Sequence, residues 1–245
     1  MKEREILEEK IAYMSQEFEK EKFTFSEKQK RQFLDFYSIL IEKNKVMNLT
    51  GITEFPLVVE KHFLDSLFIN RVVDLDKPLR IIDVGTGAGF PGIPLKIAFP
   101  NLSITLMDSM NKRILFLQEV IDALGLKDIE TVHARAEELA RKEDYREKFD
   151  LAVSRAVANL STLEEYCIPF VKMGGLFVSY KSGEIEEELD SSKAACEILG
   201  GKVKEVYKFE LGSKKRSFVV IEKCKNSPRA YPRKAGTPSR KPLGI

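Results

Sequence analysis

The stretch RIIDVGTGAGFPGIPL, Arg80 to Leu95, places an apolar run directly before four glycines and two prolines within sixteen residues. The β-branched residues at its start are typical of a buried strand. Glycine lacks a Cβ, so its backbone adopts conformations that other residues avoid and lets a ligand approach closely. The stretch therefore predicts a strand followed by a ligand-binding loop.

Strand-like runs and helical periods alternate along the chain from Leu79 onward. The first five runs lie at 79–84, 102–108, 129–134, 149–155 and 175–181. This alternation is typical of a doubly wound parallel sheet. Two further runs, 202–211 and 215–224, are joined only by Gly212-Ser213-Lys214, which predicts an antiparallel hairpin. We expect an α/β fold with a mostly parallel seven-stranded sheet that ends in this hairpin.

The residues before this sheet show helical periodicity instead. Ser26 is followed three residues later by Gln29, which predicts a capping box at the start of an amphipathic helix. A second helix is expected over 57–70. We therefore divide the chain into an N-terminal helical cap (1–74), a ligand-binding domain (75–225) and a C-terminal tail (226–245).

Composition places the chain among folded proteins of the cytoplasm. Its 245 residues are 43% hydrophobic and 32% charged, enough for one sizeable α/β core. Three widely spaced cysteines fit neither a disulfide framework nor a paired-cysteine metal site. The N-terminus lacks an apolar signal region, and no run of eighteen apolar residues occurs. We expect neither export nor a membrane span.

The tail is the one strongly biased segment. Lys223 to Ile245 holds seven Lys or Arg, four prolines and no acid. A solvated, disordered terminus is one interpretation, and composition alone favours it. The alternative is a basic strap for a phosphate backbone, which would use Arg229, Arg233, Lys234, Arg240 and Lys241.

The glycine loop is compatible with two ligands. Gly87 to Gly92 satisfies GxGxxG, which favours a dinucleotide, but Asp83 at the strand end would repel a pyrophosphate. S-adenosylmethionine carries no phosphate and is cationic at its ammonium and sulfonium. Asp83 with Gly85, Gly87 and Gly89 therefore favours this methyl donor. Asp108 ends the next strand and suits ribose hydroxyls, whichever nucleoside is bound.

The absence of certain sequence motifs narrows the range of possible methyl acceptors. The segment 154–157 reads SRAV and lacks the (N/D/S)-P-P-(Y/F) cluster common in adenine amine methylation. Cys167 is expected mid-helix and neither Cys196 nor Cys224 at a strand end, which disfavours attack on a pyrimidine carbon. A ring nitrogen such as guanine N7 is already nucleophilic, so alignment alone can supply much of the acceleration. Small-molecule and protein acceptors remain open on this argument.

Several segments together resemble a known family. They are KHFLDSL, DVGTGAGFPGIPL, MDSMNKRILFLQEV, ARAEEL, SRAVANL and YKSG. The chain from about Phe33 to Lys223 resembles the bacterial 16S ribosomal RNA guanine-N7 methyltransferases, also called glucose-inhibited division protein B. The most specific element is the FPG inside the glycine loop. The tail YPRKAGTPSRKPLG resembles the extension of members from Gram-positive bacteria, which favours the basic strap.

The resemblance implies a Rossmann-like class I methyltransferase fold and a set of donor-binding residues. In the family the donor is held by the glycine loop and by a few further residues. The positions here that match those residues are Gly85, Phe90, Ala136, Glu137 and Arg155. Gly85 would let the donor approach, and Phe90 would cover an apolar side of it. The arginine ends the fourth strand and would orient the donor or the guanine. No dedicated catalytic base is implied.

RNA contacts are expected on the rim of the same sheet edge. The candidates there are Lys112, Arg113, Arg135 and Lys181, each also explicable as a solvated charge. His62 and Asp65 lie three apart on one helical face and either reach the site from the cap or close the cap onto the core. Two histidines without a supporting cluster are too few to predict a metal site.

The chain is thus interpreted as a monomeric, cytoplasmic, S-adenosylmethionine-dependent methyltransferase that modifies guanine N7 in 16S ribosomal RNA, within the small subunit or an assembly intermediate. One alternative is a non-catalytic assembly factor that binds donor and RNA without turnover. A second is a dinucleotide oxidoreductase, which would bind nicotinamide and tolerate Asp83→Asn.

Overall fold

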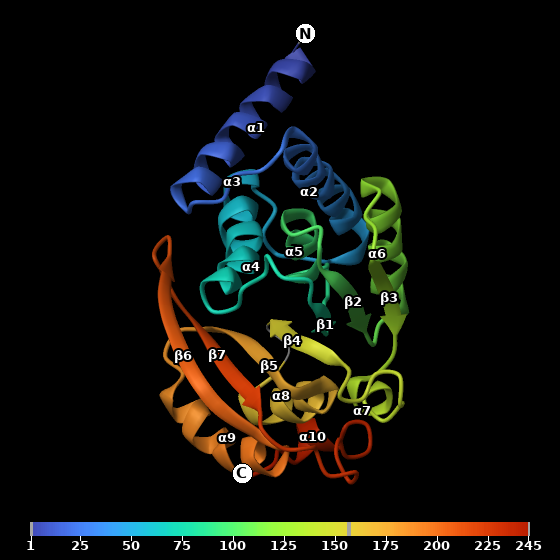
Figure 1. The fold of residues 1–245 in the computed structure, drawn as a ribbon. Coiled ribbons are helices and arrows are strands. Elements are labelled where there is room, and N and C mark those ends of the chain that lie inside the picture. The colour runs from blue at the N-terminus through green and yellow to red at the C-terminus, as the bar shows by residue number, and fades with distance from the viewer. Residues whose placement is uncertain (1, 156–157, 245) are drawn as a thin grey trace.

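The computed structural model describes residues 2–155 and 158–244, and within them seven strands form one sheet in the order β3-β2-β1-β4-β5-β7-β6 (Figure 1). The strands are β1 (Arg80–Val84), β2 (Ser103–Asp108), β3 (Ile129–His133), β4 (Phe149–Arg155), β5 (Val171–Ser182), β6 (Gly201–Leu211) and β7 (Lys214–Lys223). The first five strands pair in parallel, and β7 pairs antiparallel with both β5 and β6. The predicted doubly wound sheet with a C-terminal hairpin is confirmed.

The hairpin turn is one residue shorter than expected. Leu211 pairs with Lys214, so only Gly212 and Ser213 lie in the turn. Gly212 has a φ of +57°, as the tight turns that match strand twist require. Lys214 is therefore the first residue of β7.

Helices cover both faces of the sheet. The bounds are α1 (Lys2–Lys20), α2 (Glu27–Met47), α3 (Phe55–Val58), α4 (Asp65–Leu67), α5 (Gly92–Ala98), α6 (Asn111–Leu124), α7 (Ala136–Leu139), α8 (Leu160–Cys167), α9 (Glu186–Ile198) and α10 (Thr237–Arg240), with a 3-10 turn at Ile168–Phe170. Figure 1 shows α1 to α4 above the sheet with α5 and α6, and α8 to α10 below it. Folds of this kind bind their ligands at the carboxyl ends of the parallel strands.

The cap begins its long helix where the sequence predicts. Ser26 Oγ accepts from the Gln29 N–H, and the Gln29 side chain accepts from the Ser26 N–H, which is a complete capping box. The same Gln29 side chain donates to the Ile97 and Ala98 carbonyls at 2.9 and 3.0 Å. The cap helix α2 is thereby tied to α5 behind the glycine loop.

The second cap helix differs from the regular helix expected over 57–70. Helical backbone runs from Phe55 to Arg71, but Val59–Leu64 is π-helical and Phe68–Arg71 is a 3-10 turn. π-helical segments within helices frequently occur at functional sites because they redirect side chains. This π segment contains His62.

Each face of the sheet has its own apolar core. Phe33, Phe36 and Phe63 of the cap pack in one continuous core with Ile81 and Leu106 of the sheet. The opposite core lies between the sheet and α7 to α9. Since burial of such side chains is the main stabilising term of folding, the cap is held by the same core as the sheet.

The tail packs along α7 and α8, as Figure 1 shows. Arg146 donates to the Ser227, Pro228 and Tyr231 carbonyls, and Ser161 Oγ donates to the Leu243 carbonyl. The disordered terminus favoured by composition is therefore wrong for residues 226–244. The compensating contacts come from residues far away in sequence, so composition could not reveal them.

Across residues 2–155 and 158–244, the structure holds no helix long and apolar enough to cross a membrane.

Candidate donor cleft and acceptor cavity

The glycine loop between β1 and α5 has the left-handed backbone that its sequence predicts. Gly85, Gly87 and Gly89 have φ values of +74°, +63° and +93°. A Cβ added to Gly87 would meet nothing nearer than the Gly85 carbonyl at 4.0 Å, whereas one added to Gly89 would lie 2.6 Å from Ile93 Cγ1. Gly87 thus faces open space that a ligand can use, and Gly89 allows the helix to pack closely.

Asp83 lies behind this loop. Its side chain is fully buried, and Oδ2 accepts from Thr86 Oγ1 at 2.7 Å and from the Gly92 N–H at 2.9 Å. Its Oδ1 has no partner among the described residues. Burial raises the pKa of Asp83 to about 6. Asp83 is not among the residues that line the cleft described next, and the bonds of its Oδ2 shape the loop. Its contact with a donor ammonium stays a prediction.

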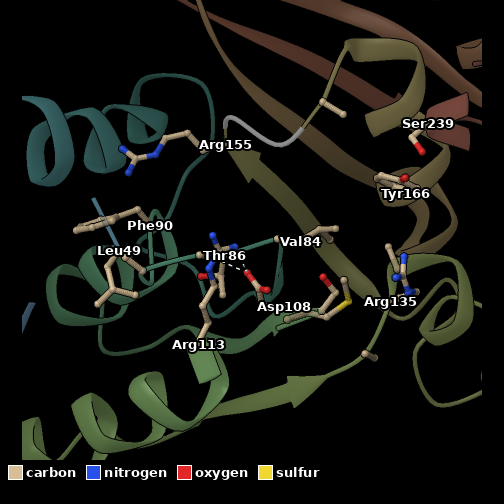
Figure 2. A pocket seen from close by; sticks show the side chains of 18 of the residues that line it. Leu49, Val84, Thr86, Phe90, Asp108, Arg113, Arg135, Arg155, Tyr166 and Ser239 are labelled. Carbon is tan, nitrogen blue, oxygen red and sulfur yellow. Dashed lines mark hydrogen bonds and ion pairs between the residues drawn. The ribbon is translucent and has the colours of Figure 1, made fainter. Parts of the chain in front are cut away.

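A cleft of about 520 Å³ opens in front of the loop (Figure 2). It runs past the ends of β2, β3 and β4 and is bounded by the cap on one side. Seven of the predicted donor-binding residues line it, namely Gly85, Gly87, Phe90, Asp108, Ala136, Glu137 and Arg155. Asp83 and Gly89 do not. The structure thus brings together residues from four separate strand ends.

Asp108 fixes one wall of the cleft at the end of β2. Its Oδ2 accepts from the Gly87 N–H at 3.0 Å and from Arg113 Nη1 at 3.1 Å, while Oδ1 accepts from the Met110 N–H at 2.8 Å. The carboxylate therefore holds the glycine loop and the start of α6 together. Its place at the end of β2 is where such folds bind ribose hydroxyls.

Phe90 forms the wall between the cleft and the cap. The His62 ring lies 4.5 Å from the Phe90 ring at an interplanar angle of 25°, and the Arg155 guanidinium carbon lies 4.9 Å from the Phe90 centroid. Burial, then the charge of Arg155, lowers the pKa of His62 to about 3. His62 is consequently neutral at physiological pH, and its Nε2 lies 2.8 Å from Thr50 Oγ1.

Arg155 joins the sheet to the cap. Its Nη1 donates to Asp65 Oδ2 at 3.0 Å, and Arg216 Nε on β7 donates to Asp65 Oδ1 at 3.1 Å. The Asp65 side chain is 7% exposed. His62 and Asp65 therefore serve in both roles considered from sequence, since they reach the site and also close the cap onto the core.

A second cavity of about 500 Å³ lies beside the first. The two share His62, Arg155 and Ala158 in their walls. Lys181, Asp65, Arg216 and Phe209 also line the second cavity. Lys181 is the penultimate residue of β5 and pairs with Glu188 at 2.6 Å, so it lies here rather than at the donor cleft.

The predicted RNA-binding residues are mostly accessible. Exposed side chains are those of Lys112, Arg135, Arg229, Lys234, Arg240 and Lys241. Arg113 and Arg135 line the donor cleft, and Lys112 is in the first turn of α6. Arg233 differs from this set because its guanidinium is paired with Glu165, whose side chain is 0% exposed.

The positions of Cys167 and Cys224 each correct a detail of the sequence argument. Cys167 is the last residue of α8 rather than mid-helix, and it is fully buried with a thiol pKa well above its usual value. Cys224 directly follows the end of β7, contrary to the expectation. Because β7 is antiparallel, Cys224 lies near the start of β5, at the edge away from the cleft. The segment 154–157, in which the sequence lacks the amine-binding cluster, includes residues 156 and 157, which lie outside the described residues.

Sequence reasoning missed several residues of the donor cleft, among them Leu49, Thr50, Tyr166 and Ser239. Leu49 and Thr50 follow α2. Tyr166 is on α8, where the sequence pattern indicates only an apolar helical face. Ser239 is in the tail, on α10. Glu137 was predicted, but its partner was not: Glu137 Oε1 accepts from the Gly236 N–H of the tail at 2.8 Å.

The architecture has structural counterparts. An S-adenosylmethionine-dependent O-methyltransferase from Thermotoga maritima superposes with a TM-score of 0.51 at 16% identity, over 77% of this chain and 73% of that one. The sheet order, the left-handed glycine loop and the carboxylate that ends β2 define a Rossmann-like fold of the kind that this methyltransferase has.

Sequence comparison identifies the particular family. Residues 28–219 match the model of the rRNA small subunit methyltransferase G family. Ribosomal RNA small subunit methyltransferase G of Lachnoclostridium phytofermentans is 52% identical over 217 residues, 88% of this chain and 90% of that protein. Its counterpart in Clostridium novyi is 48% identical over 89% of this chain and 91% of that protein. The chain belongs to the rRNA small subunit methyltransferase G family.

Proposed function

We propose that this protein transfers the methyl group of S-adenosylmethionine to N7 of one guanine in 16S ribosomal RNA. The RNA would be presented by the small subunit or an assembly intermediate, and the protein would act as a monomer in the cytoplasm, where ribosomes are assembled. The observation that carries the proposal is the pair of adjoining cavities that share His62 and Arg155.

The residues of the first cavity fit the donor. Open space in front of Gly87 admits a ligand against the backbone, and Asp108 and Glu137 add carboxylates at its walls. The carboxylates suit the ribose hydroxyls of a nucleoside, and they also favour a ligand that carries positive charge, as S-adenosylmethionine does. Gly85, Phe90, Ala136 and Arg155 complete the proposed set, while Asp83 and Gly89 act from behind the loop. S-adenosylmethionine supplies a methyl group made electrophilic by its sulfonium.

The second cavity suits a guanine base. Arg155, Lys181 and Arg216 place cationic hydrogen-bond donors around it, and guanine O6 is the acceptor that such side chains read best. Asp65 would accept from the base N1–H and amino group. A target base must leave its stack to reach a cavity of this kind. Because the two cavities share a wall, N7 of the bound guanine would then lie toward the donor cleft.

The transfer needs no proton acceptor from the protein. Guanine N7 carries an exposed lone pair, so holding it in line with the methyl group supplies the acceleration. His62 lines both cavities, and its pKa is lowered to about 3. Its ring is therefore uncharged and adds no positive charge beside the cationic donor. Stacking of the His62 ring on Phe90 would fix the orientation of the Phe90 ring in the wall of the donor cleft.

Basic side chains around the mouth would bind the phosphate backbone. We assign this role to Lys112, Arg113 and Arg135, and to Arg229, Lys234, Arg240 and Lys241 of the tail. Lys181 would contact the RNA at the base in the second cavity instead. Arg233 would contribute by anchoring the tail. In this division the cap (1–74) closes the cavities, residues 75–225 bind the donor, and the tail (226–245) extends the basic surface.

Transfer of labelled methyl groups tests this proposal. Purified small subunits from cells lacking the protein, naked 16S RNA and large subunits would be compared as acceptors. Stoichiometric labelling of small subunits or their RNA, and none of large subunits, supports it. RNA binding without any transfer would support the non-catalytic assembly factor instead.

A further inference from the structure

The tail is held to the helices below the sheet by a series of specific contacts. Arg141 on the α7 side donates to the Ala230 and Pro232 carbonyls, and Thr162 Oγ1 on α8 donates to the Pro238 carbonyl at 3.1 Å. These contacts join residues at least 76 positions apart in sequence. The tail is therefore placed by the folded domain rather than by its own secondary structure.

The strongest anchor is an ion pair between the tail and α8. Arg233 Nε and Nη2 both donate to Glu165, with Nη2 to Oε2 at 2.6 Å and Nε to Oε1 at 3.0 Å. The Arg233 N–H also donates to Oε1 at 2.6 Å. Glu165 is fully buried, so it depends on these bonds. Two-point pairs of this kind fix orientation as well as position.

From this anchor the chain reaches the donor cleft. The Gly236 N–H donates to Glu137 Oε1 at 2.8 Å, and Glu137 is itself a cleft residue that is 4% exposed. Ser239 lines the cleft next to Tyr166, on the side opposite Phe90 (Figure 2). One wall of the cleft is therefore made by a segment that follows the last strand of the sheet.

We propose that residues 226–244 are a structural part of the donor site, with Ser239 as a wall residue and Gly236 as the residue that positions Glu137. Docking of the tail and binding of the donor are then linked, so each must favour the other by the same factor. This inference rests on S-adenosylmethionine as donor and is independent of the RNA proposed above, because it concerns binding in the absence of RNA.

A bulky side chain at the wall gives the most direct test. Ser239→Trp is expected to fold normally, because Ser239 is exposed, yet to weaken S-adenosylhomocysteine binding by about tenfold or more, as measured by calorimetry. Asn226→Trp is the matched control, since Asn226 is an exposed tail residue that does not line the cleft. It is expected to keep the wild-type affinity. Equal affinities of both variants would overturn the proposal.

The anchor is tested through a substitution and its conservative counterpart. Arg233→Ala should weaken binding of the same ligand at least fivefold, and Arg233→Lys should restore part of the loss because it keeps the charge but not the two-point geometry. Circular dichroism of each variant shows whether the fold is retained. A folded Arg233→Ala protein with unchanged affinity contradicts the linkage.

Reciprocity supplies a readout in the wild-type protein. Saturation with S-adenosylhomocysteine should slow hydrogen exchange of peptides spanning 228–244 by several-fold, because the ligand stabilises the docked tail. Peptides of α1, far from the cleft, serve as the internal control. Exchange in the tail that does not respond to the ligand would show that the wall is not coupled to the site.

Discussion

Arg155 Nη1 on β4 donates to Asp65 Oδ2 of the cap at 3.0 Å, and this largely buried pair stands at the boundary between the two cavities. The pair closes the cap over the sheet edge and at the same time holds the guanidinium over Phe90. Stability and site geometry are thus carried by the same side chains.

Removal of the Asp65 charge should destabilise the fold. Asp65→Asn leaves Arg155 and Arg216 facing each other without the carboxylate that both contact. We expect a loss of about 3 kcal/mol in the free energy of unfolding, the usual cost of breaking a buried pair. Urea titration measures it, and Asp74→Asn, in an exposed pair with Lys77, should change little. A loss as small as that control would contradict the account.

Two glycine substitutions should separate ligand binding from folding. Gly87→Ala places a methyl group in open cleft space, so we expect a folded protein, strained by about 1 kcal/mol, that binds the donor weakly. Gly92→Ala places its Cβ against Leu106 Cδ2 and 2.9 Å from Asp83 Oδ2, so we expect a marked loss of stability. Thermal unfolding and donor calorimetry on both variants distinguish these outcomes. Equal unfolding temperatures would refute the assignment.

Protonation of His62 should contribute to acid sensitivity. Its pKa is about 3 in the folded protein, below the ordinary value of 6.5, so the folded state binds fewer protons. Its contribution is complete above pH 6.5 and is lost as the pH falls toward 3. From pH 7.5 to pH 5, wild type should lose roughly 2 kcal/mol more than His62→Gln. Equal losses in urea titrations would show that His62 is not held neutral.

Glu164 on α8 should have the opposite effect. It is fully buried, and burial raises its pKa from 4.5 to about 8. The folded state therefore holds an extra proton between these values, and stability declines as the pH rises from 4.5 to 8. Glu164→Gln should gain on the order of a few kcal/mol over wild type between pH 5 and pH 8.5. Exposed Glu197→Gln is the control, and a pH-independent difference would argue against a protonated Glu164.

The sheet and the glycine loop were predictable because local signals carry them. The β-branched runs and the glycine spacing each specify backbone conformation within a few residues, and the structure follows both. Asp83 shows the limit of such reasoning. Its position at a strand end predicts a ligand contact, but it did not indicate that Oδ2 would accept from the Gly92 N–H and the Thr86 hydroxyl and so shape the loop.

The features that the sequence did not predict depend on contacts between segments that are far apart in the chain. Ser239 lines the donor cleft, and Arg233 of the same tail pairs with Glu165 across 68 residues; no sequence periodicity indicates such a pairing. The basic composition of the tail indicated disorder or phosphate binding, yet one of its arginines is used inside the protein. The π-helical turn at Val59–Leu64 likewise depends on packing rather than on a local pattern.

Mapping of N7-methylguanosine in 16S RNA tests the central claim most directly. Borohydride reduction followed by aniline cleaves RNA at this nucleoside, and primer extension locates the cut. RNA from cells lacking the protein should have lost one cut that wild-type RNA shows, and purified protein with S-adenosylmethionine should restore it on their small subunits. An identical cleavage pattern in both RNAs would contradict the account.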